Sequence, residues 1–79
     1  MNIHDQKIIN LIDDLMLEKS SEMVELKMHE LFDLVATSPS PVDIEKLKVL
    51  RDLKKAFEDI KSTGFESFFY ALGSLKKLY

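Results

Sequence analysis

Apolar residues recur at three- and four-residue steps through almost all of this sequence, and one stretch interrupts them strongly. That stretch, ATSPSP at residues 36–41, contains two Ser-Pro dipeptides, which disfavour helix in the residue before each proline. On both sides the spacing fits the 3.6-residue repeat of an α-helix. With 46% hydrophobic residues and only two glycines and two prolines, the sequence predicts a single all-α domain over residues 1–79.

The first 36 residues can be interpreted in two ways. The first is one continuous helix over residues 3–36, with Asn2 as its N-cap. On such a helix an apolar stripe and an acidic stripe on the opposite side both continue past Ser20 and Ser21 without changing face. Lys27 interrupts the apolar stripe, and it either extends its ammonium group to water or pairs with an acid. The alternative is a break at Ser20-Ser21, because serine commonly caps helices. We favour the continuous helix.

A second arm follows the interruption and is expected to be broken once. Ser40 as N-cap and Pro41 as the first helical residue predict a helix over residues 41–62. Gly64 can adopt the backbone conformation that ends a helix, and a last helix is expected over residues 65–78. Because the first helix would be about 50 Å long, the predicted fold is an elongated helical hairpin.

Two such arms lying side by side would leave apolar side chains on their flanks uncovered. These side chains are Ile8, Leu15, Leu17, Leu26, Met28, Phe69 and Tyr70. Pairing two hairpins into a dimeric four-helix bundle would cover them. If the chain breaks at the serine pair instead, a monomeric four-helix bundle would enclose the aromatic residues as ordinary core.

The size of the chain and its lack of cysteine limit how it can be stabilised. A single hydrophobic core in 79 residues gives a free energy of unfolding of only roughly 3 to 5 kcal/mol. Without cysteine, neither disulfides nor thiolate metal sites can add to it, so another protein chain is the most available reinforcement. No stretch resembles a signal peptide or a membrane span, and we expect a cytoplasmic protein.

The sequence offers little catalytic chemistry. His29 has Glu25 and Asp33 four residues away on either side, a row that could hold a divalent ion weakly but is more typical of a solvated helix face. Asp13 and Asp14 are adjacent, so they lie about 100° apart on a helix and do not form a carboxylate pair. We therefore expect no enzyme, no bound metal and no cofactor.

The aromatic residues point instead to protein binding. Five of the seven lie in residues 65–79. The apolar seam predicted for the last helix consists of Phe65, Phe68, Leu72, Leu75 and Tyr79, and Phe69 and Tyr70 fall outside it. The expected function is that of a small protein-protein interaction module, such as a regulator, chaperone, inhibitor or immunity protein, whose partner is another protein or a second copy. The candidate partner-binding residues are Phe69, Tyr70, Gly73, Met28 and Phe32.

Nucleic-acid binding is the alternative function. Residues 1–36 carry a net charge of −5 and residues 37–79 a net charge of +2, and most bases of the second half lie on one predicted helix. They are Lys46, Lys48, Arg51, Lys54, Lys55 and Lys61. Acidic residues are interleaved with them and the whole chain has a net charge of −3, which weakens this prediction.

Overall fold

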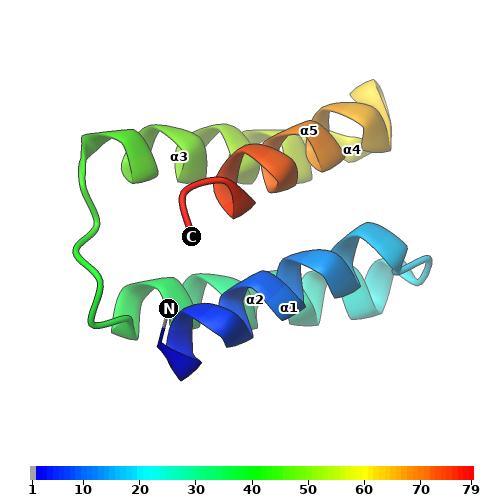
Figure 1. Cartoon of the computed structure of the whole chain (residues 1–79). Helices are drawn as coiled ribbons and strands as arrows, with labels where there is room; N and C mark the ends of the chain where they lie inside the picture. The colour runs from blue at the N-terminus through cyan, green and yellow to red at the C-terminus, as the bar shows by residue number, and fades with distance from the viewer. Residues whose placement is uncertain (1) are drawn as a thin grey trace. The chain divides into compact units, whose positions relative to one another are not determined.

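The computed structural model describes residues 2–79, and within them the chain is all-α, as the sequence predicts (Figure 1). The helices are α1 (Ile3–Leu17), α2 (Ser21–Thr37), α3 (Ile44–Glu58), α4 (Ile60–Thr63) and α5 (Phe65–Lys76). They belong to two compact units. One unit contains α1 and α2, and the other contains α3, α4 and α5.

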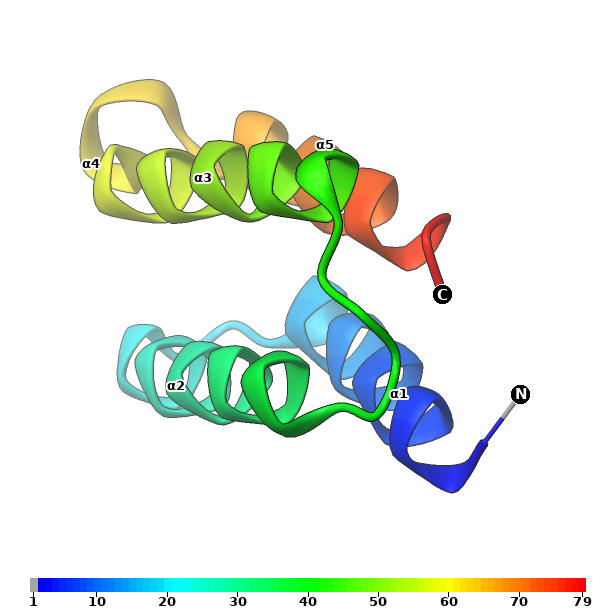
Figure 2. The same ribbon diagram turned by 90° about the vertical axis from the view of Figure 1, so that its left-hand side faces the viewer.

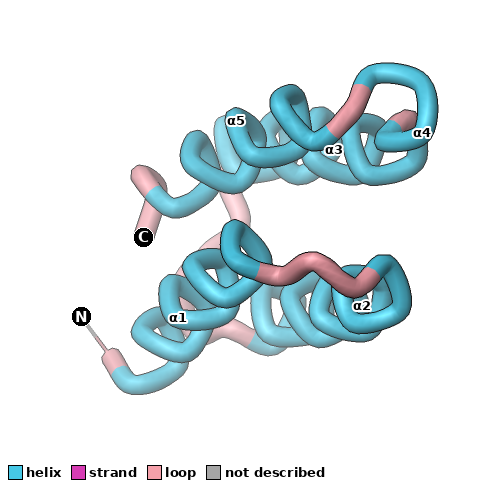
Figure 3. The backbone as a smooth tube through the Cα atoms, turned by 90° about the vertical axis from the view of Figure 1, so that its right-hand side faces the viewer, coloured by secondary structure: helices cyan, strands magenta, loops and turns pink. Residues whose placement is uncertain are grey.

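The predicted continuous helix over residues 3–36 is wrong, and the alternative break at the serine pair is confirmed. α1 ends at Leu17, and a short loop, pink in Figure 3, leads to the start of α2 at Ser21. Ser20 is the N-cap of α2, and its hydroxyl accepts a hydrogen bond from the backbone N–H of Met23 at 3.5 Å. Serine therefore has the capping role that makes it common at helix starts.

The carboxylate of Glu18 gives the physical reason for the break. One of its oxygens accepts hydrogen bonds from the backbone N–H groups of Lys19 and Ser20, at 3.1 and 3.2 Å. A continuous helix would pair these groups with earlier carbonyls. The other oxygen accepts from the ammonium group of Lys27 at 2.8 Å, so this lysine pairs with an acid of its own chain. The spacing of apolar residues along the sequence is the same with or without these hydrogen bonds, so it could not predict the break.

We expect the Glu18→Gln variant to be less stable than the wild type at neutral pH and nearly as stable in acid. The hydrogen bond from Lys27, helped by the backbone N–H of Ser20, holds the pKa of Glu18 below its ordinary value. Stability from a lowered pKa is present above the unfolded-state value of about 4.3 and is lost as the pH falls through the folded-state value. Thermal melts at neutral pH and at about pH 3 measure the difference.

Glu58→Gln, which changes an exposed glutamate of α3, is the matched control for this variant. Its melting temperature should follow that of the wild type at both pH values. A Glu18→Gln deficit of the same size in acid and at neutral pH would contradict the role given to the carboxylate.

α1 and α2 lie antiparallel and side by side in the first unit (Figures 1 and 2). The ring nitrogen Nε2 of His4 donates to the carbonyl oxygen of Leu34 at 2.6 Å, which joins the start of α1 to the end of α2. Beside it, the carboxylate of Asp5 accepts the hydroxyl groups of Ser38 and Ser40, at 3.1 and 2.9 Å. These bonds hold the Ser-Pro loop against the first turn of α1.

One predicted helix start is confirmed and one is wrong. The side chain of Asn2 caps α1 by accepting from the backbone N–H of Asp5 at 2.7 Å, as expected. The predicted cap of the second arm at Ser40 is wrong, because its hydroxyl is bonded to Asp5 instead. Asp43 is the N-cap of α3 and accepts from the backbone N–H of Lys46 at 2.9 Å.

The predicted break of the second arm near Gly64 is confirmed. The predicted helix over residues 41–62 corresponds to α3 and the single turn α4, which Asp59 separates. Gly64 then connects α4 to α5 with φ 77° and ψ −172°. This backbone region is essentially restricted to glycine, so the residue type is required by the turn.

Buried apolar side chains lie on all four longer helices, α1 and α2 in the first unit and α3 and α5 in the second. The largest fully buried side chains are Ile8, Ile12, Leu15, Val24, Leu31, Leu53, Phe68, Leu72 and Leu75. In the second unit, Phe68 is the centre of an aromatic cluster, and its ring centroid lies 6.0 to 6.3 Å from those of its three neighbours. These neighbours are Phe57, Phe65 and Phe69. The central residues of the seam predicted for the last helix, Phe68, Leu72 and Leu75, are therefore buried in the core of the second unit.

Part of the argument for a dimer does not hold. Ile8, Leu15 and Met28, which were expected to need a second chain, are buried within a single chain. The remaining exposed flank residues are Leu17 and Tyr70, at 80% and 79% exposure, together with Leu26. Ile8, Leu15 and Met28 therefore need no second chain to bury them.

Candidate functional site

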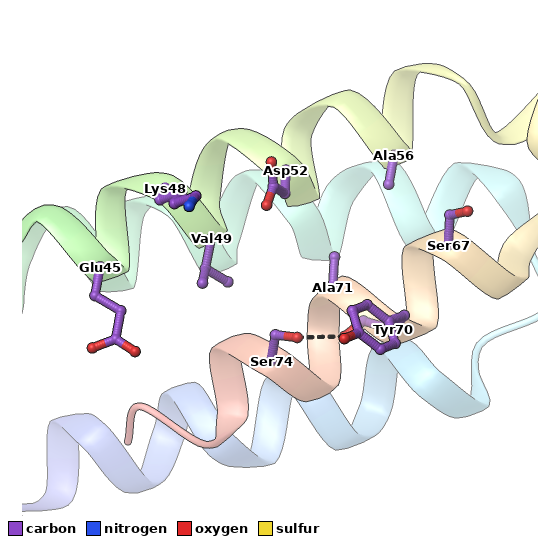
Figure 4. Close-up of a pocket in the computed structure, with 9 residues that line it drawn as sticks. All are labelled: Glu45, Lys48, Val49, Asp52, Ala56, Ser67, Tyr70, Ala71 and Ser74. Atoms are coloured by element: carbon purple, nitrogen blue, oxygen red, sulfur yellow. Dashed lines mark hydrogen bonds between the residues drawn. The ribbon is translucent and has the colours of Figure 1, made fainter.

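A groove of about 540 Å³ lies between α3 and α5 in the second unit (Figure 4). The residues that line it are Glu45, Lys48, Val49, Asp52 and Ala56 from α3, and Ser67, Tyr70, Ala71 and Ser74 from α5. From its first to its last α3 residue, Glu45 to Ala56, the groove extends over twelve residues, or about 16 Å of helix. It is thus about three helical turns long.

Small side chains create this groove. Val49 and Ala56 point from α3 toward α5, and Ala71 points back toward α3 (Figure 4). On α5 the neighbouring positions are Ser67 and Ser74, one turn to either side of Ala71. Larger side chains at these positions would fill the space between the two helices. The floor of the groove is therefore apolar and shallow, and its sides are the two helices themselves.

The two rims of the groove differ in chemistry. The α3 rim carries Lys48 between two acids, Glu45 and Asp52, so its net charge is negative. The α5 rim carries the hydroxyl group of Ser74 and the ring of Tyr70. Ser74 donates to the backbone carbonyl of Tyr70 at 3.0 Å, as the dashed line in Figure 4 marks. The ring itself stays exposed and available for contact.

The structure places the predicted partner-binding residues in different environments. Tyr70 lies at the edge of the groove, and Phe69 is half-buried with its ring 5.6 Å from that of Phe65. Gly73 is a half-buried residue of α5. In the other unit, on α2, Met28 is buried and Phe32 is half-buried. These last two are not among the residues that line the groove.

Sequence reasoning missed the floor of the groove. Val49, Ala56 and Ala71 carry no distinctive chemistry, and alanine in a helix usually signals only helix propensity. Their importance depends on α3 facing α5, which a single sequence does not reveal. The one available signal was that Tyr70 falls outside the apolar seam of its helix.

A second hollow, of about 380 Å³, lies between α1 and α2. The residues that line it are Lys7, Asn10, Leu11, Asp14, Lys27, Glu30 and Leu34. Charged side chains of both signs line most of it, and Lys27 is already held by Glu18. This hollow has no exposed aromatic ring and is a weaker candidate than the α3–α5 groove.

The histidines do not form a metal site in the part of the chain that the structure describes. No group of three or more histidine, aspartate or glutamate side chains in residues 2–79 could hold a metal ion, and this includes the row around His29. His4 is bonded to the carbonyl oxygen of Leu34. Within the same residues, none of the helices is both long and apolar enough to span a membrane.

The predicted lysine strip is only partly present on the surface. Lys46 is buried near the start of α3. The other predicted bases, Lys48, Arg51, Lys54, Lys55 and Lys61, are exposed. Comparison of the chain with protein-family models, with curated proteins and with solved structures gives no match, so a functional proposal depends on the surfaces described above.

Proposed function

We propose that this chain is a small, non-enzymatic protein-binding module that receives one amphipathic helix of a partner protein in the α3–α5 groove. The observation that carries the proposal is the exposed ring of Tyr70 beside a groove floored by Ala56 and Ala71. Tyrosine is among the residue types that contribute most to binding energy, because its large face packs and its hydroxyl group tolerates water.

The form of the groove favours a helix as the occupant. Its α3 lining residues are spaced along one helix face over about three turns, and its α5 lining residues follow the same pattern. A third helix can therefore lie along both, with aliphatic side chains at i, i+3 or i+4, and i+7 over the alanine floor. A small ligand would fit less well, since sites of that kind enclose most of the ligand surface.

The charges on the α3 rim favour a partner helix with basic residues on the side that faces α3. Glu45 and Asp52 outnumber Lys48 on the α3 side. A partner with lysine or arginine on the flank that faces α3 would complement this rim and would also be steered toward it. The regulator, chaperone, inhibitor and immunity classes would all fit such a module, and a cytoplasmic location belongs to the same proposal.

A peptide selection tests this proposal directly. A display library of helical peptides of about 15 residues would be selected against the wild type and counter-selected against the Tyr70→Asp variant. We expect recovered peptides to share an apolar i, i+3 or i+4, i+7 pattern with a basic flank. Their affinity should fall at least about tenfold in Tyr70→Asp and stay near that of the wild type in Tyr70→Phe, which keeps the ring.

Three results would count against the proposal. They are a selection that recovers no helical pattern, peptides that bind the wild type and Tyr70→Asp equally, and peptides that Tyr70→Phe also fails to bind. Circular dichroism of both variants, with unchanged helix content, shows that any loss comes from the surface and not from unfolding.

The exposed bases of α3 support nucleic-acid binding as a second candidate function. Such binding would weaken steeply as salt rises, because bound lysines and arginines release counterions from the phosphates. Binding in the apolar groove would respond far less. A salt titration with a labelled duplex oligonucleotide therefore separates the two candidates.

A further inference from the structure

The outer face of α3 combines exposed apolar side chains with bases. Ile44 is 85% exposed and Leu47 is 47% exposed. Lys48, Arg51 and Lys55 are exposed on the same face, within about 60° of Ile44 around the helix. These five residues are called the basic stripe below.

The outer face of α2 has the opposite character. Glu22, Glu25, His29 and Asp33 are exposed within about 60° of one direction around the helix. Leu26, at 62% exposure, lies among them as an isolated apolar side chain. These five residues are called the acidic stripe. It extends over twelve residues, from Glu22 to Asp33, and the basic stripe extends over twelve, from Ile44 to Lys55, so each is about 16 Å long.

We infer that the acidic stripe of one copy of this chain binds the basic stripe of a second copy. The two stripes have opposite charge and equal length, so they would attract each other along their whole length. Leu26 would then cover the exposed apolar surface of Ile44 and Leu47. A nucleic acid would satisfy the bases but would leave these apolar side chains without a suitable contact. The second copy therefore explains both features of the basic stripe.

The two stripes also determine the kind of assembly. Each copy carries both stripes, on different helices. Two copies can therefore form a closed dimer with two such contacts, or successive copies can join through one contact each into longer assemblies. A single helix-on-helix contact is smaller than a standard protein interface, so the affinity is low and depends on concentration. Because charges contribute much of it, raising the salt concentration should weaken it.

Charge reversal tests the inference. The acid-reversed variant is Glu25→Lys with Asp33→Lys, and the base-reversed variant is Arg51→Glu with Lys55→Glu. None of these four residues lines the α3–α5 groove, so this test is independent of the proposed helix binding. The mean mass in solution is measured by analytical ultracentrifugation over a dilution series, at about 0.05 M and about 1 M salt.

The expected results are specific. The wild-type mass should rise with concentration at low salt and fall toward 9.1 kDa at high salt. Each reversed variant alone should stay monomeric, while an equimolar mixture of the two should associate, because the mixture contains one native and one inverted pair of stripes. A control with Lys7→Glu and Lys61→Glu changes the net charge as much as base reversal does, outside both stripes, and should associate like the wild type.

Several outcomes would overturn the inference. They are a wild type that remains at 9.1 kDa at every concentration, association that survives both reversals, and a mixture that fails to associate although both variants keep their helix content. Tight, salt-sensitive binding of a duplex oligonucleotide by a monomeric wild type, abolished by base reversal, would assign the basic stripe to nucleic acid instead.

Discussion

Replacing Phe68 with alanine is expected to leave most of the chain unfolded at room temperature. Its side chain is fully buried and its ring contacts those of three other phenylalanines. Truncating such a phenylalanine costs about 3 to 5 kcal/mol, from lost burial and from the cavity that remains. The free energy of unfolding of a domain of this size without disulfides is of about the same magnitude, so the loss would remove most of it.

Urea titrations followed by far-ultraviolet circular dichroism measure this loss. Phe68→Leu keeps most of the buried volume and should cost only about 1 to 1.5 kcal/mol. Tyr70→Ala removes an exposed ring from the same helix and should change stability by less than about 0.5 kcal/mol. If Phe68→Ala unfolded at the same urea concentration as Tyr70→Ala, the aromatic cluster would not be the core of its unit.

The second large effect is expected at Gly64. An alanine there must take φ 77° and ψ −172°, which should cost about 1 to 3 kcal/mol. A Cβ atom at this position would meet no other atom within 4 Å, so the cost comes from the backbone alone.

D-alanine, introduced by chemical synthesis, is a sharp control for this explanation. It carries the same Cβ atom but prefers the mirror-image backbone, and the mirror image of this conformation lies in the extended region that an L-residue adopts freely. Gly64→D-Ala should therefore match the wild type or exceed it by about 0.4 to 1 kcal/mol, because the unfolded chain loses freedom. Equal destabilisation by both alanines would contradict the backbone explanation.

Local signals in the sequence predicted much of the fold. The cap at Asn2 and the break at Gly64 each depend on one residue type at one place, and both are confirmed. The start of α3 was predicted too early, with Ser40 as its cap, whereas the structure shows Asp43 as the N-cap. The choice between them depends on Asp5, which lies 35 residues before Ser40 and holds its hydroxyl.

The first break and the groove required information that periodicity does not contain. The loop after α1 is held by the Glu18 carboxylate together with Lys27, and such side-chain bonds leave the apolar phase unchanged. The groove needs Ala56 and Ala71 to face each other from two helices. Tyr70 could be singled out in advance because it falls outside the seam of its own helix.

The central claim, that the α3–α5 groove binds a helix, is tested most directly by nuclear magnetic resonance. The isotope-labelled chain would be titrated with a peptide from the selection described above, while the position of each backbone amide signal is followed. We predict progressive shifts at Val49, Ala56, Ser67, Tyr70 and Ser74, with the amides of α1 and α2 unmoved. Shifts confined to α1 and α2, or no shifts at saturating peptide, would contradict the claim.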